Sequence, residues 1–148
     1  MFIGPTDFDF SRDTYAPFLN VQLTLIPGLR VQGGLRVDFV DDFDREVSPR
    51  VGATYTIAAT GTTLRANWGE GFKVPSFYSL ADPVVGNAEL VPETSMSVEV
   101  GLIQRLWSDQ MTLRLSFFYN EFEDLIDFDP TIFRLVNRDE VDIKGVEM

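Results

Sequence analysis

Residues 64–105 read LRANWGEGFKVPSFYSLADPVVGNAELVPETSMSVEVGLIQR. Side chains at its two ends alternate between apolar and polar types, as they do in a β-strand with one apolar face. Between the ends lie Gly-Glu-Gly-Phe-Lys at 69–73, Pro-Ser-Phe at 75–77 and Gly-Asn-Ala-Glu-Leu-Val-Pro-Glu at 86–93. Prolines stiffen this middle part and Gly-Asn favours a turn, so the stretch predicts two strands joined by a long loop.

The same alternation continues on both sides of this stretch. Residues 29–39 place Leu, Val and Phe at odd positions and Arg, Gln and Asp at even positions. Residues 95–106 and 111–119 repeat the pattern, weaker copies lie at 18–26, 49–59 and 63–72, and a seventh strand starts near Arg134. A period of two residues is the signature of a strand. The sequence therefore predicts an all-β, antiparallel meander of about seven strands.

The connections between the predicted strands alternate between short and long. Tight turns fall at 27–28, 60–62 and 107–110, whereas the connections at 41–48, 74–92 and about 127–133 are longer and more polar. Transmembrane β-barrels have this pattern, with short periplasmic turns and longer extracellular loops. Phe39, Phe72 and Tyr119 lie on the apolar parity near the long loops and Trp107 lies at a short turn, as two aromatic girdles would. A soluble β-sandwich with ordinary core aromatics is the alternative that this pattern leaves open.

Composition excludes several classes of protein. The chain has 148 residues, which is one domain by length, and its net charge of −11 argues against a nucleic-acid partner. It has no Cys and no His, so the thiol nucleophile and the commonest general base are missing, and no enzyme motif is visible. We therefore expect neither enzymatic activity nor a cofactor. No run approaches 18 apolar residues, which excludes a transmembrane helix but not a barrel, whose strands give a weak hydropathy signal.

The two motif blocks resemble the TonB-dependent outer-membrane receptors, in which a GFK.PSF..L block and a GN..L.PE.S.S.EVG block flank one extracellular loop. Further segments are similar to the later barrel strands of that family: YAPFL at 15–19, GLRVD at 34–38, SPRVGATY at 48–55, SFFYN at 116–120, DLI at 124–126 and KGVE at 144–147. The plug domain, with its TonB-contacting segment, and the terminal aromatic strand have no counterpart here, and the first residues do not read as a secretory signal. The resemblance implies that residues 1–148 are a partial barrel domain, an internal piece of a receptor of the 22-stranded class.

The resemblance also implies a function and a location. Such a receptor takes up a scarce nutrient across the outer membrane of a Gram-negative bacterium, and the candidates are iron–siderophore complexes, haem and cobalamin. The implied partners are outer-membrane lipid, the plug domain and remaining barrel strands, the TonB–ExbB–ExbD system acting through that plug, and the extracellular ligand. A passive, porin-like barrel would share the alternation but not the motif blocks. A soluble β-sheet binding module would need a second layer over its apolar face, which nothing left in the chain supplies.

Two groups of residues are candidates for ligand contact. On the 73–92 loop, Phe77, Tyr78 and Asn87 are plausible extracellular contacts, although we favour a role for the motif residues in bracing the loop against the barrel rim. Six charged residues on the polar parity are predicted to face the lumen: Arg30, Arg36, Arg65, Glu99, Arg105 and Arg114. They either guide substrate and contact the plug or pair with neighbouring charges across strands, and we favour pairing.

Two acidic features complete the prediction. The run at 41–46 contains carboxylates that suit a hard cation such as calcium, but it lacks the spacing and glycine of a calcium loop, so we expect a solvated loop and no metal. Glu70 shares the apolar parity of Trp68. It therefore either faces lipid near the outer interface or is turned inward by a bulge at Gly69 or Gly71.

Overall fold

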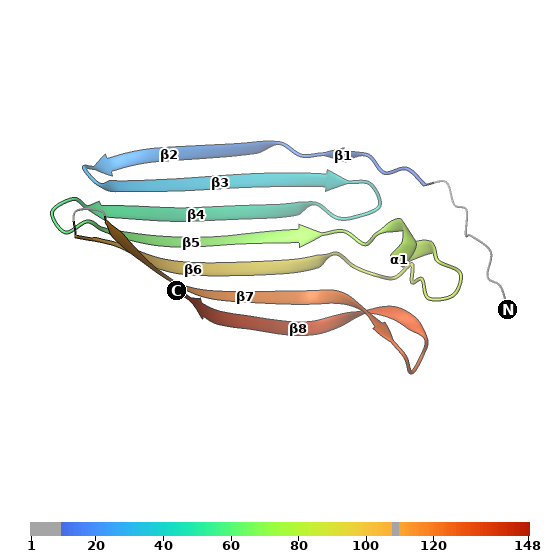
Figure 1. Cartoon of the computed structure of the whole chain (residues 1–148). Helices are drawn as coiled ribbons and strands as arrows, with labels where there is room; N and C mark the ends of the chain where they lie inside the picture. The colour runs from blue at the N-terminus through green and yellow to red at the C-terminus, as the bar shows by residue number, and fades with distance from the viewer. Residues whose placement is uncertain (1–9, 108–109) are drawn as a thin grey trace.

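The computed structural model describes residues 10–107 and 110–148, apart from the side chain of Asp139. Its strands are β1 (Thr14–Tyr15), β2 (Phe18–Ile26), β3 (Leu29–Val40), β4 (Glu46–Ile57), β5 (Thr62–Lys73), β6 (Glu93–Leu106), β7 (Met111–Asp129) and β8 (Arg134–Glu147), with helix α1 (Phe77–Ala81) between β5 and β6. They lie side by side in one antiparallel sheet, as Figure 1 shows. The predicted antiparallel all-β fold is confirmed.

The first strand position is occupied by two collinear pieces, β1 and β2. β1 pairs with β3 through Thr14↔Val40 and β2 through Phe18↔Arg36, so the register continues unchanged across the gap. Pro17 lies in the gap and has no N–H to give to the ladder, which accounts for the interruption. Its carbonyl still accepts the Val37 amide at 3.0 Å. The eight strands therefore fill the seven positions that the sequence predicts.

The two faces of the sheet differ in chemistry. Directly paired residues share a face, so the register can be followed from strand to strand. One row across the sheet is Leu23, Val31, Ala53, Ala66, Val100, Phe117 and Val146. The adjacent row on the opposite face is Gln22, Gln32, Gly52, Asn67, Glu99, Phe118 and Gly145. We call the faces that contain these rows the apolar face and the polar face.

The buried side chains gather where the loops lie, not under the middle of the sheet. Pro75 is fully buried, Leu90 is 4% exposed, Val40 is 7% exposed and Asp38 is 2% exposed. The apolar face, in contrast, leaves large side chains such as Leu23 and Phe117 about half exposed. An apolar surface of this extent needs a non-aqueous neighbour.

The predicted loop at 127–133 is shorter in the structure, because its first three residues belong to a strand. β7 has 19 residues and continues to Asp129, where it pairs with Arg134 of β8. Only 130–133 connect the two strands. The predicted loop at 41–48 also shortens to 41–45, because the residues from Glu46 pair with the end of β3. At the predicted turn 107–110, residues 108–109 lie outside the described residues.

The remaining connection, 74–92, is long as predicted, and we call it the rim loop. It contains α1, which the sequence analysis did not predict. The hydroxyl of Ser76 caps this five-residue helix by accepting the Ser79 amide at 3.0 Å. Among the described residues, no helix is long and apolar enough to cross a membrane.

Candidate functional site: the rim loop and the polar face

The rim loop leaves β5 and is fixed to β8 by hydrogen bonds. The Leu135 amide donates to the Val85 carbonyl at 2.8 Å, and Nε of Arg134 donates to the Gly86 carbonyl at 3.1 Å. These contacts join segments about fifty residues apart in sequence. The long loop is therefore held at its middle as well as at its two ends.

Asn87 holds the rim loop in place. Its Nδ2 donates to the Leu135 carbonyl at 2.9 Å, and its Oδ1 accepts the Glu89 amide at 3.0 Å. Its own amide donates to the Ser79 carbonyl at 2.8 Å, which connects it to α1. Both polar atoms of this side chain are hydrogen-bonded to the backbone of the same chain. These bonds support a role for Asn87 in bracing the loop rather than in direct ligand contact.

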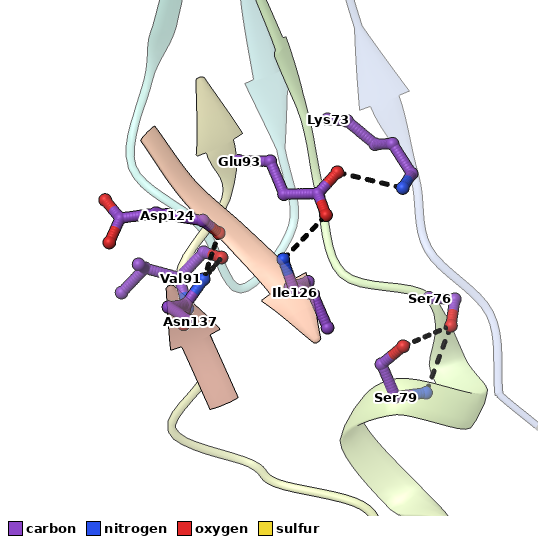
Figure 2. Close-up of polar contacts among 8 residues, drawn as sticks. All are labelled: Lys73, Ser76, Ser79, Val91, Glu93, Asp124, Ile126 and Asn137. Carbon is purple, nitrogen blue, oxygen red and sulfur yellow. Dashed lines mark hydrogen bonds and ion pairs between the residues drawn. The ribbon is translucent and has the colours of Figure 1, made fainter. Parts of the chain in front are cut away.

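Asn137 of β8 makes a second brace, which the sequence analysis missed. Its Oδ1 accepts the Val91 amide at 3.0 Å, and its Nδ2 donates to the carbonyls of Val91 at 3.1 Å and Asp124 at 2.6 Å, as Figure 2 shows. One side chain thus joins the rim loop to both strands of the β7–β8 hairpin. An isolated asparagine in a polar strand gave no signal for this role.

Glu93 joins three strands at the same end of the sheet. Its two carboxylate oxygens accept Nζ of Lys73 and the amide of Ile126, each at 2.8 Å (Figure 2). Partial burial raises the pKa of Glu93, but the hydrogen bonds and positive charge outweigh it, so the pKa lies below its ordinary value. The residue is the glutamate of the Pro-Glu pair in the second motif block, and this part of the motif therefore has a structural role.

The two predicted aromatic contacts have different surroundings. Phe77 stacks on Phe10 with ring centroids 5.6 Å apart. The Arg12 guanidinium lies 4.8 Å from the Phe77 ring and 4.9 Å from the Phe43 ring, so Phe77 is part of an internal cluster. Tyr78 is 53% exposed. Of the three predicted loop contacts, Tyr78 alone presents most of its side chain to solvent.

The six residues predicted to face the lumen share the polar face by register. Arg30 and Arg65 lie in one row of paired residues. That row continues through Gly101 of β6 and Ser116 of β7, so the odd-numbered residues Glu99 and Arg105 and the even-numbered residue Arg114 lie on the same face. The assignment of this face to a lumen stays a prediction, because a single layer has two open sides.

Ion pairs link some of the charges on the polar face. Arg36 and Asp38 form a two-pronged pair, with Nη2–Oδ1 at 2.7 Å and Nε–Oδ2 at 2.8 Å. Arg65 Nη2 lies 3.6 Å from Glu99 Oε1. Nε of Arg65 is buried without a hydrogen-bond partner among the described residues. Local pairing therefore accounts for part of the charge on this face and leaves one arginine with an unused donor.

A hollow of about 850 Å³ lies over β5, β6 and β7 beside these charges. The polar-face residues that line it include Arg65, Asn67, Glu99, Arg114, Ser116 and Asn120. These side chains supply hydrogen-bond donors, acceptors and two positive charges.

Glu70 lies on the same face of the sheet as Trp68, as its position in the sequence predicts. The β5–β6 register runs without a shift through Glu70↔Met96, so no bulge against β6 turns the side chain. Met96 pairs with Glu121, which pairs with Asp142. The row of paired residues that contains Glu70 on this face is therefore mostly acidic. The row directly follows the one that contains Trp68 and Tyr119. Glu70 therefore marks the point where the apolar face ends.

A proline accounts for the end of the β4–β5 ladder beside Glu70. Thr56 donates its amide to the carbonyl of Gly28, in the turn before β3. Even-numbered amides of β4 thus point toward β3, and odd-numbered ones point toward β5. Pro49 has an odd number and no N–H, and the ladder to β5 stops one residue earlier, at Arg50↔Gly69.

Comparison with known proteins decides the family. Residues 3–148 match the family described as TonB dependent receptor-like, beta-barrel. The chain belongs to this family. The resemblance of the two motif blocks to TonB-dependent receptors is thereby confirmed.

The proteins that this TonB-dependent receptor barrel resembles include vitamin B12 transporters and a siderophore receptor. The vitamin B12 transporter BtuB of Vibrio vulnificus is 40% identical over 87 residues, which are 56% of this chain and 14% of that protein. BtuB of Photobacterium profundum is 29% identical over 148 residues, covering 93% of this chain and 23% of that protein. The siderophore receptor PirA of Pseudomonas aeruginosa superposes with a TM-score of 0.83 at 27% identity, covering 91% of this chain and 27% of PirA.

A copper transporter, OprC, shares the fold with a TM-score of 0.76 at 18% identity, covering 91% of this chain and 25% of OprC. This chain thus spans between 14% and 27% of the lengths of these four proteins.

Proposed function

We propose that this chain forms part of the barrel wall and extracellular rim of an outer-membrane receptor, which imports a scarce nutrient with energy supplied through TonB. The substrate class is a compact metal complex: cobalamin, an iron–siderophore or haem. Relatives named as vitamin B12 transporters and a siderophore receptor support this range. The plug that contacts TonB and the remaining strands belong to the rest of the receptor.

The observation that carries the proposal is the single layer with one apolar and one polar face. On β7 the apolar face runs from Met111 to Tyr119, which are nine residues. A tilted strand needs about 9–11 residues to cross the hydrocarbon core of a membrane. Aromatic residues end this segment and acidic residues follow, as at a membrane interface. The apolar face accordingly contacts lipid, and the polar face contacts the interior of the barrel.

The two ends of the strands have different roles in this arrangement. The rim loop and the β7–β8 hairpin lie at the end of the strands beyond the acidic row, and we assign this end to the outside of the cell. The tight turn at Gly28 and the turn after β4 lie at the opposite, periplasmic end. Tyr78 is then available to an arriving ligand, and the hollow beside Arg65 and Arg114 faces the plug or the transport path.

An uptake assay tests the proposal in the full-length receptor that contains this chain. The receptor is expressed in a Gram-negative strain that lacks its own receptors for cobalamin and ferric enterobactin, with and without TonB. We expect saturable uptake of labelled cyanocobalamin or ferric enterobactin that disappears when TonB is removed. Uptake that is linear in concentration and unaffected by loss of TonB would instead identify a passive pore.

A further inference from the structure

The tip of the β7–β8 hairpin extends beyond the rest of the sheet. The β6–β7 ladder ends at Thr94↔Glu123, whereas the β7–β8 ladder continues to Asp129↔Arg134. We call residues 124–138 the hairpin tip. A two-stranded hairpin is marginally stable by itself in water, so this tip needs support from another segment.

The rim loop supplies that support through backbone and side-chain contacts. The Val85 carbonyl accepts the Leu135 amide at 2.8 Å, and Nδ2 of Asn87 donates to the Leu135 carbonyl at 2.9 Å. Asn137 contacts both polar backbone atoms of Val91. The loop therefore occupies the place that a further strand would take beside the hairpin tip.

Asn137 also stabilises an unusual backbone conformation. Asp124 has φ +56°, in the left-handed region that non-glycine residues seldom adopt. The carbonyl of Asp124 accepts Nδ2 of Asn137 at 2.6 Å. The same amide group thus holds both the left-handed residue of β7 and the rim loop.

The supported segments carry exposed apolar side chains. Tyr78 on the rim loop is 53% exposed, and Ile132 and Phe133 at the hairpin tip are 60% and 58% exposed. Phe128 packs edge-on against Phe133 with ring centroids 5.1 Å apart, which orients that ring. These side chains offer rigid apolar contacts at the outer end of the molecule.

We propose that the rim loop and the hairpin tip form one preformed unit that stays closed during ligand capture, and that Asn137 is its positioning residue. Asn137 acts through Tyr78, Ile132 and Phe133, which it holds in place for the ligand. Preorganised contacts bind more tightly because no ordering is required on binding. This inference rests on the proposed function.

Substitution of Asn137 combined with a reversible crosslink tests the inference in the full-length receptor. Asn137→Ala frees the loop from the hairpin, and we expect about a tenfold rise in the half-saturation concentration for cyanocobalamin or ferric enterobactin uptake, with the maximal rate unchanged. Val85→Cys with Leu135→Cys then places a disulfide at a position already joined by a backbone hydrogen bond. In the Asn137→Ala background, oxidation of this pair should restore the wild-type half-saturation concentration, which a general loss of folding would not allow.

Two control variants separate position from chemistry. Gln104→Ala removes an amide that donates to the Thr60 carbonyl at 2.7 Å, at the opposite end of the sheet, and should leave half-saturation unchanged. Thr56→Cys with Thr63→Cys crosslinks a directly paired position within the sheet and controls for the disulfide itself. This chain contains no cysteine that would compete for pairing.

Two outcomes would overturn the inference. One is a wild-type half-saturation concentration in Asn137→Ala. The other is loss of uptake in the oxidised Val85→Cys, Leu135→Cys receptor with recovery on reduction, because the unit would then have to open. If the wild-type receptor takes up neither probe, the proposed function fails, and spin labels at Ala88 and Thr131 test the unit separately. A narrow distance distribution that broadens in Asn137→Ala supports the unit, and an equally broad distribution in both proteins refutes it.

Discussion

Glu93 accepts the backbone amide of Ile126 at 2.8 Å, where Glu93 lies one residue and Ile126 three residues beyond the last pair of the β6–β7 ladder. A side chain thus replaces the ladder where the two strands separate. The other carboxylate oxygen holds Lys73 of β5. The Pro-Glu pair of the second motif block therefore supplies a residue that connects three strands below the rim loop.

Removal of the Glu93 carboxylate should loosen the hairpin tip. In the full-length receptor, Glu93→Ala leaves the Ile126 amide without a partner, which costs about 1–3 kcal/mol locally. Glu93→Gln keeps an acceptor for that amide and should have a smaller effect. Hydrogen exchange of residues 124–129 measures both, and equal protection in wild type and Glu93→Ala would contradict the assigned role.

Acid should have the same effect through protonation of Glu93. Its pKa is below the ordinary value in the folded protein, so its stabilising contribution is complete above the ordinary glutamate pKa and is lost as the pH falls through the folded value. Exchange of residues 124–129, corrected for the intrinsic pH dependence, should therefore accelerate as the pH falls below the ordinary glutamate pKa. Glu93→Gln should lack this acceleration, and an identical acid response in that variant would assign the effect to another group.

The turn between β2 and β3 requires glycine at position 28. Gly28 has φ +88°, and a Cβ there would lie 2.4 Å from the Thr56 carbonyl oxygen. Gly28→Ala should destabilise the receptor by about 1–3 kcal/mol, seen as a lower temperature for the heat-induced shift in gel mobility. Gly33→Ala is the matched control, because its nearest neighbouring atom is 4.0 Å away. Equal shifts in the two variants would remove the steric explanation.

Surface labelling tests the direction of insertion. In the full-length receptor, a cysteine at Ala88 on the rim loop should react with an impermeant maleimide on intact cells, because the rim loop is assigned to the outside. A cysteine at Gln110, at the other end of the sheet, should react only after the outer membrane is permeabilised. Reaction at Gln110 alone on intact cells would show that the assigned topology is inverted.

Strand order and faces could be predicted from the sequence because they depend on local alternation. Odd and even positions of 29–39 fall on opposite faces as the period of two requires, and from β2 onward each strand pairs with the next one along the chain. The long rim loop was also evident, since its prolines and glycines interrupt that period. These features require no knowledge of distant contacts.

The errors concern contacts between segments far apart in the sequence. Residues 127–129 contain two aspartates and were placed in a polar loop, but pairing with β8 extends β7 through them. Asn137 looks like an ordinary polar strand residue, and its role appears only when the rim loop lies against it. The contacts of Phe77 with Arg12 and Phe10 likewise had no signal in the sequence, and its role as a ligand contact stays a prediction.

The most direct test of the account is the environment of each side chain along β7. Spin labels placed singly at positions 111–119 of the full-length receptor in lipid bilayers report collision with oxygen, which concentrates in lipid, and with a water-soluble nickel complex. We predict that odd positions, including Leu113, Leu115 and Phe117, favour oxygen, and that even positions, including Arg114 and Ser116, favour nickel. An inverted alternation, or equal access to nickel at every position, would contradict a sheet with one face in lipid and the other in a polar interior.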